Sequence, residues 1–522
     1  MYKNRVVDAM SGIYMRSKTV LFIFLIVFMA VFSAISFPVQ AKPARQWASD
    51  RKVPGYLEDT FTPFLLADQN RTVHAFTSQW IDDGSRRLAV VYRKWSLAGG
   101  WTRPIDVLLA PSGSATFLGA FLDISGTIHV IFAQGENRKV DVYYSYARVE
   151  TADSASAWSA PVLIGSDLSG VNSAAMSGDL LSNLVVIYSG NLDGSGVYAV
   201  HSSDAGRDWS DPIQIFAPKT SDLTPYSLRL FSGREKHIQA AWNVVSALGV
   251  DEELYFSTYD IESANWAKSM ELEKRVEYPE YFGPSFPAIV DNGNEIVIMY
   301  NGGNPFSGLP VGYGRPVQRV TVSTNGGQSW SEAINPFPFH VGRSGEHSLA
   351  LDGVGRPHAL FVQRIETLVD GQYSIVGGIW HSIFENGSWT NPDRFVTTYS
   401  PHDVRSIIVQ GNVLLVVWRE DPGEGTHGVW YSYYVLDVPE LPVVPISTIN
   451  PPTAVTNNNI VDVNHTPVAL IETSTPVKLT DSQREILDGS SNPANPIIIG
   501  MIPVIIVLAG VVLMYKYFRV RS

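Results

Sequence analysis

The chain has 522 residues, with 42 Gly, 32 Pro, 11% aromatic residues and no cysteine. The lack of cysteine excludes disulfides, zinc–thiolate sites and cysteine nucleophiles. The formal net charge of −12 excludes nucleic acid as an expected partner, because binding to a phosphate backbone needs clustered Lys and Arg. The many Gly, Pro and aromatic residues are typical of an all-β protein built from short strands and tight turns.

The N-terminal segment has the pattern of an export signal. Basic residues between Lys3 and Lys18 precede an apolar run over residues 20–37, and small residues follow up to Ala41. This order of basic, apolar and small-residue regions predicts a signal peptide over residues 1–41. An uncleaved N-terminal anchor is the alternative, and both place the following chain outside the cytoplasm.

Residues 42–437 contain a repeated strand that ends in an aromatic residue. Seven copies occur, and their terminal aromatics lie 54 to 61 residues apart. The copies are Val73–Phe76, Ile128–Phe132, Leu184–Tyr188, Ile238–Trp242, Ile296–Tyr300, Pro357–Phe361 and Leu414–Trp418. So regular a spacing indicates a repeat architecture.

A second series of tryptophans follows the first series at a lag of 21 to 30 residues. Its members are Trp101, Trp158, Trp209, Trp266, Trp330 and Trp389. Most of them open a phrase that continues into a short strand, as in residues 101–109 and 158–164. The second unit shows the expected set of four strands, at 117–122, 128–132, 140–147 and 158–164. Four antiparallel strands repeated about every 57 residues predict a β-propeller.

The seventh unit, residues 402–435, has three strands and no Trp phrase. Ring closure can take the missing strand from residues 46–60 at the other end of the domain. We therefore expect seven blades, with six blades and one degenerate unit as the alternative.

Beyond the repeats, residues 438–496 are rich in Pro, Thr and Asn and predict an extended stalk. Residues 497–515 carry no charge and, as a helix, span about 28 Å, close to the hydrocarbon thickness of a bilayer. Lys516 and two arginines follow, so residues 516–522 are expected to be a cytoplasmic tail. The sequence thus predicts a single-pass protein of the cell membrane with its propeller on the extracytoplasmic side.

Histidines recur at equivalent strand positions, at His74, His129 and His358. They fall in separate blades and no metal-ligand spacing is found, so they are interpreted as structural. No metal or other cofactor is predicted.

Two turns between third and fourth strands are sharper than the others. Residues 202–209, with Ser202, Asp204, Gly206 and Trp209, resemble the Asp-box of the sialidase-like (BNR-repeat) propellers, as do Ser323, Asn325, Gly327 and Trp330 of residues 323–330. In that family the box is a structural turn at the blade periphery, so the resemblance implies a fold and no activity.

The resemblance stops short of the sialidase active site. An Arg-Ile-Pro phrase is absent, Arg103-Pro104 lies in a Trp phrase, and the family's arginine triad for the substrate carboxylate has no matching positions. Whether the chain is an enzyme is therefore left open, and a true sialidase is not expected.

Candidate pocket residues lie in loops between second and third strands and between blades. They are Glu277, Glu280, Tyr281, Arg315, Arg343, Arg364, Arg419 and Glu420, with Glu346 and His347 close by. Paired carboxylates, arginines and tyrosines suit an acidic sugar. The main expectation is a membrane-anchored binding domain for glycans or another surface component. The alternative is a glycoside hydrolase of the exo-sialidase type that uses the central pocket.

Overall fold

The computed structural model describes residues 46–81, 87–109, 114–136, 139–169, 173–179, 181–233, 236–275, 282–303, 316–338, 340, 342–369, 372–398, 401–420 and 427–443. The expected signal peptide, the span at 497–515, the tail and nearly all of the stalk lie outside these ranges. Within the described ranges, no helix has the length and apolar character needed to cross a membrane.

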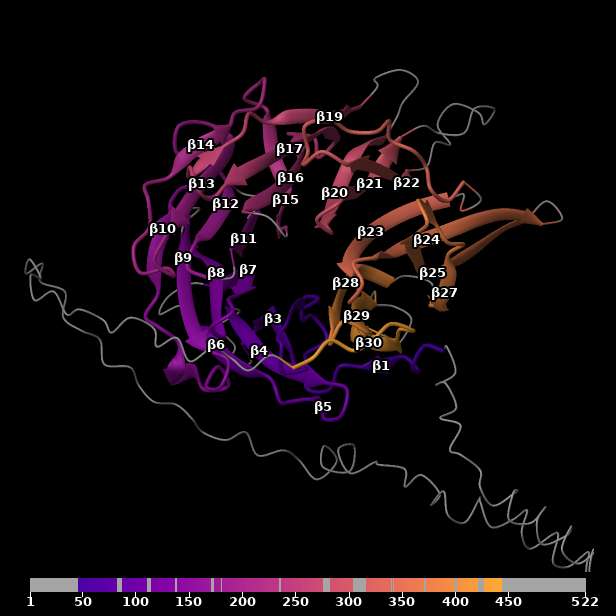
Figure 1. Ribbon diagram of the computed structural model, residues 1–522, viewed down its shortest axis with the longest axis horizontal. Helices are drawn as coiled ribbons and strands as arrows, with labels where there is room; N and C mark the ends of the chain where they lie inside the picture. Colours follow the sequence, from indigo (N-terminus) through magenta and orange to yellow (C-terminus); the bar gives the residue numbers. More distant parts are fainter. Residues whose placement is uncertain are drawn as a thin grey trace, which may run out of the picture. The chain divides into compact units, whose positions relative to one another are not determined.

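Seven antiparallel sheets make up the described part of the chain (Figure 1). Blade 1 contains β2 (Phe64–Ala67), β3 (Val73–Trp80), β4 (Leu88–Ser96), β5 (Gly100–Trp101) and β6 (Ile105–Leu109). Blade 2 contains β7 (Ser114–Leu122), β8 (Thr127–Glu136), β9 (Lys139–Arg148) and β10 (Val162–Gly165). Blade 3 contains β11 (Ala174–Gly178), β12 (Leu184–Gly190), β13 (Gly196–Ser202) and β14 (Ile213–Phe216).

The second half of the ring repeats this plan. Blade 4 contains β15 (Leu223–Ser232), β16 (His237–Ser246), β17 (Asp251–Asp260), β18 (Asn265–Trp266) and β19 (Met270–Lys274). Blade 5 contains β20 (Phe282–Asp291), β21 (Ile296–Gly303) and β22 (Val317–Ser323), with a single bridge from Val320 to Ile334 in place of a fourth strand. Blade 6 contains β23 (Gly342–Leu351), β24 (Pro357–Val369), β25 (Gln372–Glu385), β26 (Ser388–Trp389) and β27 (Asp393–Val396). Blade 7 contains β28 (Pro401–Val409), β29 (Val413–Glu420), β30 (Gly428–Val435) and β1 (Arg51–Lys52).

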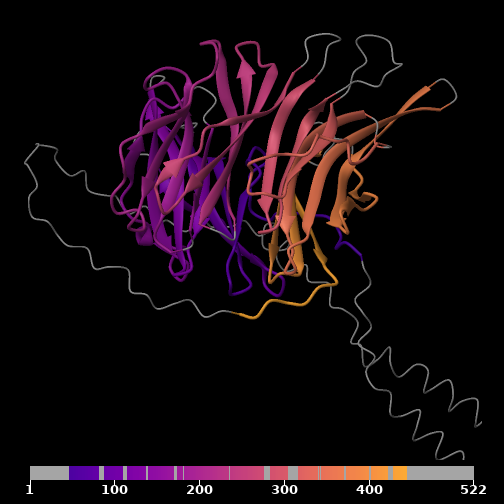
Figure 2. The same ribbon diagram turned by 45° about the horizontal axis from the view of Figure 1, so that its top comes forward.

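The innermost strands contact one another in sequence and close a ring. The contacts run from β2 to β7, β11, β15, β20, β23 and β28, and from β28 back to β2. The sheets are arranged radially around this ring, and Figure 2 shows the blades standing side by side. The seven-bladed propeller predicted from the repeat is confirmed.

Blade 7 joins the two ends of the domain. β1 pairs antiparallel with β30, and Val53 N donates to Val429 O at 2.8 Å. The closing strand predicted for residues 46–60 is therefore confirmed. Beyond β30 the chain turns back over the end of the blade, where Leu436 N and Leu441 N donate to the carbonyls of Asn412 and Gln410.

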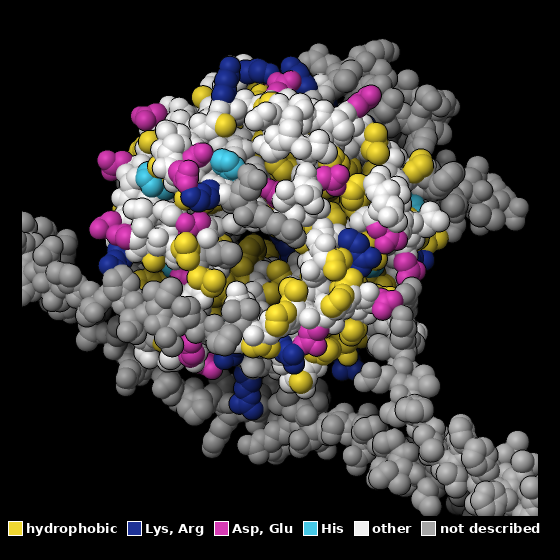
Figure 3. Space-filling view, in the orientation of Figure 1, with side chains coloured by type: hydrophobic (Ala, Val, Ile, Leu, Met, Phe, Trp, Pro, Cys, Tyr) yellow, Lys and Arg dark blue, Asp and Glu magenta, His cyan; other side chains and the backbone are white. Residues whose placement is uncertain are grey.

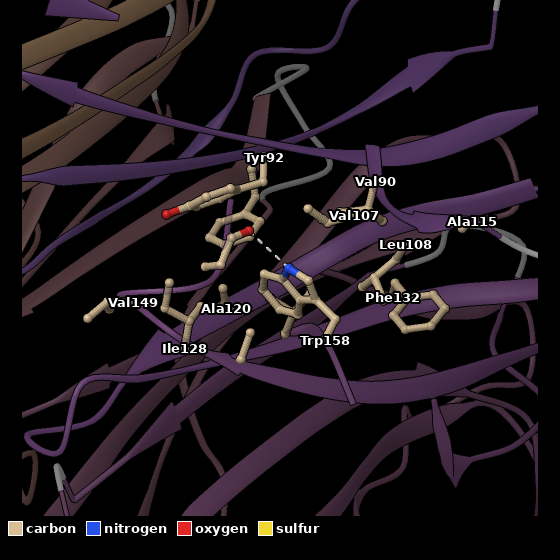
Figure 4. Close-up of a cluster of buried hydrophobic side chains, with 14 residues drawn as sticks. Val90, Tyr92, Val107, Leu108, Ala115, Ala120, Ile128, Phe132, Val149 and Trp158 are labelled. Atoms are coloured by element: carbon tan, nitrogen blue, oxygen red, sulfur yellow. Dashed lines mark hydrogen bonds between the residues drawn. The ribbon is translucent and has the colours of Figure 1, made fainter. Parts of the chain in front are cut away.

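Apolar side chains fill the space between blades. Figure 4 shows Trp158 of blade 2 among Val107 and Leu108 of blade 1 and Ile128 and Phe132 of its own blade. The indole Nε1 donates to Ala152 O at 3.1 Å, so its one polar atom is satisfied.

Three other tryptophans of this series pack in the same way on the preceding blade. Ring centroids lie 5.7 Å apart for Trp101 and Tyr431, 5.0 Å for Trp209 and Tyr144, and 4.9 Å for Trp330 and Phe256. Each partner lies on the third strand of the blade before. The tryptophans therefore plug the interfaces between blades, as the spacing predicts.

The turns at 202–209 and 323–330 have matching hydrogen bonds. Ser202 Oγ accepts from Gly206 N at 2.9 Å, and Asp204 Oδ1 accepts from Asp208 N at 3.0 Å. In the second turn Ser323 Oγ accepts from Gly327 N at 2.9 Å, and Asn325 Oδ1 accepts from Ser329 N at 2.9 Å. Gly206 and Gly327 have φ angles of 86° and 85°, which favour glycine.

The recurrent histidines lie in buried chains of hydrogen bonds within single blades. His129 is 2.7 Å from Tyr144 Oη and 3.4 Å from Asp123 Oδ2. His74 repeats this arrangement with Tyr92 and Asp68, and His358 with His381 and Asp352. The imidazoles therefore join the turn between strands one and two to the third strand, a structural role.

Candidate functional site

The innermost strands of blades 4 to 7 each contain a β-bulge at the same height. In each of them, two residues lie opposite one residue of the second strand, between the register pairs Tyr226↔Asn243 and Arg229↔Ala241 in blade 4, for example. The equivalent breaks are at 285–288 in β20, 344–347 in β23 and 402–405 in β28. A bulge redirects side chains and bends its strand, and bulges are common next to active sites.

Three of the bulges contain a non-glycine residue with positive φ. Ser227, Phe286 and Asp403 have φ angles of 50°, 52° and 49° and occupy equivalent positions in blades 4, 5 and 7. Such backbone strain in L-residues is found mostly where the surrounding structure holds a functional arrangement in place.

The bulges surround a central cavity of about 220 Å³. It is lined by residues of six blades: Phe117, Leu118, Ser173, Ala174, Tyr226, Ser227, Arg229, Phe286, Glu346, His347, Asp403, Val404 and Arg405. Figure 3 shows the hollow at the centre of the ring. The bulges lie near the starts of the innermost strands. These starts lie at the end of the ring that also carries the loops between second and third strands. Ligands were expected at this end.

Two arginines meet in this cavity. Arg229 on β15 and Arg405 on β28 both line it, and no carboxylate among the described residues lies within ion-pair distance of either. Burial, together with the charge of Arg405, lowers the pKa of Arg229 to about 9. The guanidinium group of Arg229 therefore still carries its charge at neutral pH. Among the described residues, most of their N–H donors have no acceptor, and Arg229 donates one N–H to Leu228 O at 3.0 Å.

Two carboxylates line the same cavity. Glu346 Oε2 accepts from Asp403 N at 3.4 Å, which links the bulges of blades 6 and 7. Asp403 contributes its own carboxylate from the strained bulge position. Two acids and two unpaired arginines thus face one space, a combination that suits a ligand with a negative charge.

His347 is buried beside these groups and is held neutral. Its Nε2 lies 2.8 Å from Met299 O and must donate to it, so Nδ1 is the unprotonated nitrogen. Nδ1 has no hydrogen-bond partner in the described part of the chain. Burial lowers the pKa of His347 to about 4, and the charge of Arg229 acts in the same direction.

The cavity continues into an apolar space of about 310 Å³. The two spaces share Phe117, Leu118, Ala174, Arg229 and Arg405, and the second adds Phe61, Phe64, Met176, Leu228 and Leu230. The guanidinium of Arg419 lies 5.9 Å from the ring centroid of Phe61. The central space therefore has a charged part and an apolar part.

Most loop residues predicted for a pocket cannot be placed. Glu277, Glu280, Tyr281 and Arg315 lie outside the described residues. Arg343 and Arg364 are direct register partners across β23 and β24, but their side chains are not among those described.

The last two candidates differ in their surroundings. Arg419 lies beside the apolar part of the cavity, and its Nη2 is 3.3 Å from His427 Nε2. Glu420 is buried within blade 7, where its Oε1 accepts from Trp418 Nε1 at 2.7 Å and from Thr398 Oγ1 at 2.5 Å. Neither residue lines the part of the cavity that holds the arginine pair.

Sequence reasoning missed Arg229, Arg405, Tyr226 and Asp403, because it looked for ligand groups in loops. The one available signal was weak: the segments 225–229, 284–288, 344–348 and 401–405 interrupt apolar strands at the same place in four repeats. Glu346 and His347, named beside the loop candidates, do line the cavity.

A larger hollow of about 560 Å³ lies between blades 4 and 5 at the other end of the ring. Its lining includes Lys268, Asp291 and the turn at 324–328, and no arginine is among its lining residues. Among the described residues, no group of three or more His, Asp or Glu is arranged to hold a metal ion.

No family model and no curated protein matches the chain. Solved structures do. An ulvan lyase of a polysaccharide lyase family is 13% identical, with 74% of this chain and 96% of that chain covered and a TM-score of 0.44. The leech intramolecular trans-sialidase is 12% identical over 75% and 70% of the two chains, with a TM-score of 0.38. An α-L-arabinofuranosidase from Fusarium graminearum is 12% identical over 75% and 98%, with a TM-score of 0.42. None of these similarities bears on the residues of the cavity.

Proposed function

We propose that the propeller is a glycoside-processing enzyme that acts on an acidic glycan in its central cavity. This is the alternative of the sequence analysis, and the content of the cavity supports it over a binding role at the rim. The observation that carries the proposal is the pair of unpaired guanidinium groups, Arg229 and Arg405, beside the carboxylates of Glu346 and Asp403.

In this proposal the arginines hold the carboxylate of the sugar, because guanidinium groups bind carboxylates with paired hydrogen bonds. Glu346 and Asp403 then serve as the acid and base that glycosidic bond cleavage needs. Tyr226 lines the same space and is available to the leaving oxygen. The sialidase-like resemblance of the turns at 202–209 and 323–330 is compatible with this role, although it identifies no catalytic residue.

Localisation forms part of the same proposal. The apolar segments at 20–37 and 497–515, with cationic residues after the second, support export of the propeller and its attachment to the cell membrane. The propeller would then meet glycans or other surface components on the extracytoplasmic side of the membrane.

The test uses the full-length chain in detergent with a panel of sialosides, uronate polysaccharides and neutral glycans. We expect turnover of an acidic glycan only, with products identified by mass spectrometry. Glu346→Gln and Asp403→Asn should each lower kcat about 100-fold or more, since general acid–base groups contribute roughly that factor. Arg229→Met and Arg405→Met should lower kcat/KM for the acidic glycan.

Matched controls are Glu332→Gln and Arg103→Met, two exposed side chains far from the cavity, which should leave turnover unchanged. Binding of an acidic glycan without cleavage would replace this proposal by the binding role. Turnover that survives Glu346→Gln and Asp403→Asn would move the chemistry to other residues.

A further inference from the structure

Phe286 is the one bulky residue among the strained bulge positions. The equivalent residues of blades 4, 6 and 7 are Ser227, Gly345 and Asp403, which are small or short and polar. A large side chain with a φ of 52° is an outlier, since its Cβ crowds the neighbouring backbone. Pro287 follows and lacks an N–H group, so the bulge leaves no unpaired donor at that position. The bulge therefore holds Phe286 in its strained backbone conformation.

Packing within the described residues does not account for the position of the Phe286 ring. Among the described residues it belongs to none of the buried apolar clusters and forms no aromatic pair, whereas most phenylalanines of the blades do. It is half-buried and lines the charged part of the cavity with Arg229, Glu346 and His347. A ligand that has an apolar face and a charged group could contact the ring and the unpaired charges together.

We propose that Phe286 is a specificity-determining residue whose ring stacks against the apolar face of a sugar while Arg229 and Arg405 hold that sugar's carboxylate. The inference rests on the proposed function and narrows it to a ring-shaped sugar acid, such as a uronic or sialic acid. A pyranose presents C–H groups on one face, and these pack against the negative face of an aromatic ring. The bulge at Phe286 lies at the height of both arginines, because Arg229 and Arg405 each follow the equivalent bulge position, Ser227 or Asp403, by two residues.

The test separates recognition of the sugar from recognition of the charge. Binding of glucuronic acid, N-acetylneuraminic acid and inorganic sulfate to the full-length chain is measured by calorimetry, and the unfolding midpoint is measured in parallel. Phe286→Gly should weaken binding of the sugar acid that the wild type prefers about tenfold, the effect of one lost stacking contact. Sulfate binding should stay unchanged, and the unfolding midpoint should be equal or higher because the backbone strain is relieved.

Two variants complete the test. Phe286→Tyr keeps the ring and should keep the affinity for the sugar acid. Gln410→Gly relieves a φ of 60° in a turn of blade 7 outside the cavity, and should raise the midpoint without changing any affinity.

A lower midpoint with unchanged sugar affinity in Phe286→Gly would overturn the inference and leave the proposed function standing. Equal weakening of sulfate and sugar acid would also overturn it, since the ring would then only support the arginines. If the wild type binds neither sulfate nor a sugar acid, the anion site itself fails, and the proposed function fails with it.

Discussion

His347 carries the clearest consequence of burial at a single residue. Folded protein keeps the imidazole neutral down to its pKa of about 4, whereas the unfolded chain takes up a proton near the ordinary value of 6.5. Unfolding therefore binds a proton between these values, so the stability from His347 is complete above pH 6.5 and is lost as the pH falls toward 4.

We expect the free energy of unfolding to fall with acidification across this window, by about 1.4 kcal/mol per pH unit for each such proton. His347→Gln should show a shallower fall than the wild type in urea titrations at pH 7 and pH 5. His237→Gln removes a half-buried imidazole outside the cavity and serves as the matched control, whose fall should be steeper than that of His347→Gln. His381 has its pKa lowered to about 3 by burial, so part of the slope should remain in the first variant. Identical slopes for all three proteins would contradict the assignment.

The residues of the cavity show where sequence reasoning ends. Alternation along a strand predicts which side chains share a face, but one extra residue in a bulge reverses that prediction for the rest of the strand. Arg229 and Arg405 come together only because β15 and β28 contain a bulge at the same height. Nothing local in the sequence marks a bulge with certainty, so these residues could not be assigned in advance.

At the scale of elements, the strands that end in aromatics were predictable and the fourth strands were less so. The phrase at Trp158 predicted a strand from that residue, but β10 starts at Val162, directly after Pro161. Blades 1, 3 and 6 also start this strand right after a proline, at Ile105, Ile213 and Asp393. Proline has no N–H for the sheet, so it interrupts the pairing between the tryptophan and the strand that follows.

The turn at 202–209 gives a prediction for such an element. A Cβ at Gly206 would lie 2.1 Å from Tyr144 Oη of the preceding blade, in addition to the strain of a φ of 86°. Gly206→Ala should therefore lower the free energy of unfolding by about 3 to 5 kcal/mol, from strain and overpacking together. Gly249→Ala has a similar φ of 73° and no atom within 4 Å, so it should cost only about 1 to 2 kcal/mol. Equal losses in urea unfolding would show that the contact with Tyr144 is unimportant.

At the scale of the whole molecule, the ring closes where the first described segment of the chain joins blade 7 to blade 1. Arg93, buried in blade 1, donates to Pro54 O at 2.6 Å and to Thr102 O, and its guanidinium lies 4.6 Å from the ring of Tyr56. It therefore fastens the closing segment to the first blade, which adjoins the last. The architecture, including closure, was predictable because a repeat of known length has few ways to bury its faces.

Arg93→Met should remove the hydrogen bonds to the carbonyls of Pro54 and Thr102 and lower the free energy of unfolding by about 3 kcal/mol, because a hydrogen bond from a charged group contributes roughly 1.5 to 3 kcal/mol. Because each blade is covered by its neighbours, we expect a single transition at a lower urea midpoint. Hydrogen exchange should show lost protection at the amide of Val53, which bonds to Val429 O. Arg103→Met removes an exposed arginine and should change stability by less than about 0.5 kcal/mol. Full protection of Val53 in Arg93→Met would contradict this role.

Both segments that lead away from the propeller leave it from blade 7, and the hydrogen bonds at the C-terminal exit predict how it responds to tension. A pull on residue 443 would load the hydrogen bonds of Leu441 and Leu436 one after the other, so we expect this exit to open under little force. Further pulling loads β30, which is paired with β29 along its whole length and must shear many bonds at once. The exit segment is therefore expected to detach from blade 7 before the strands of the ring separate.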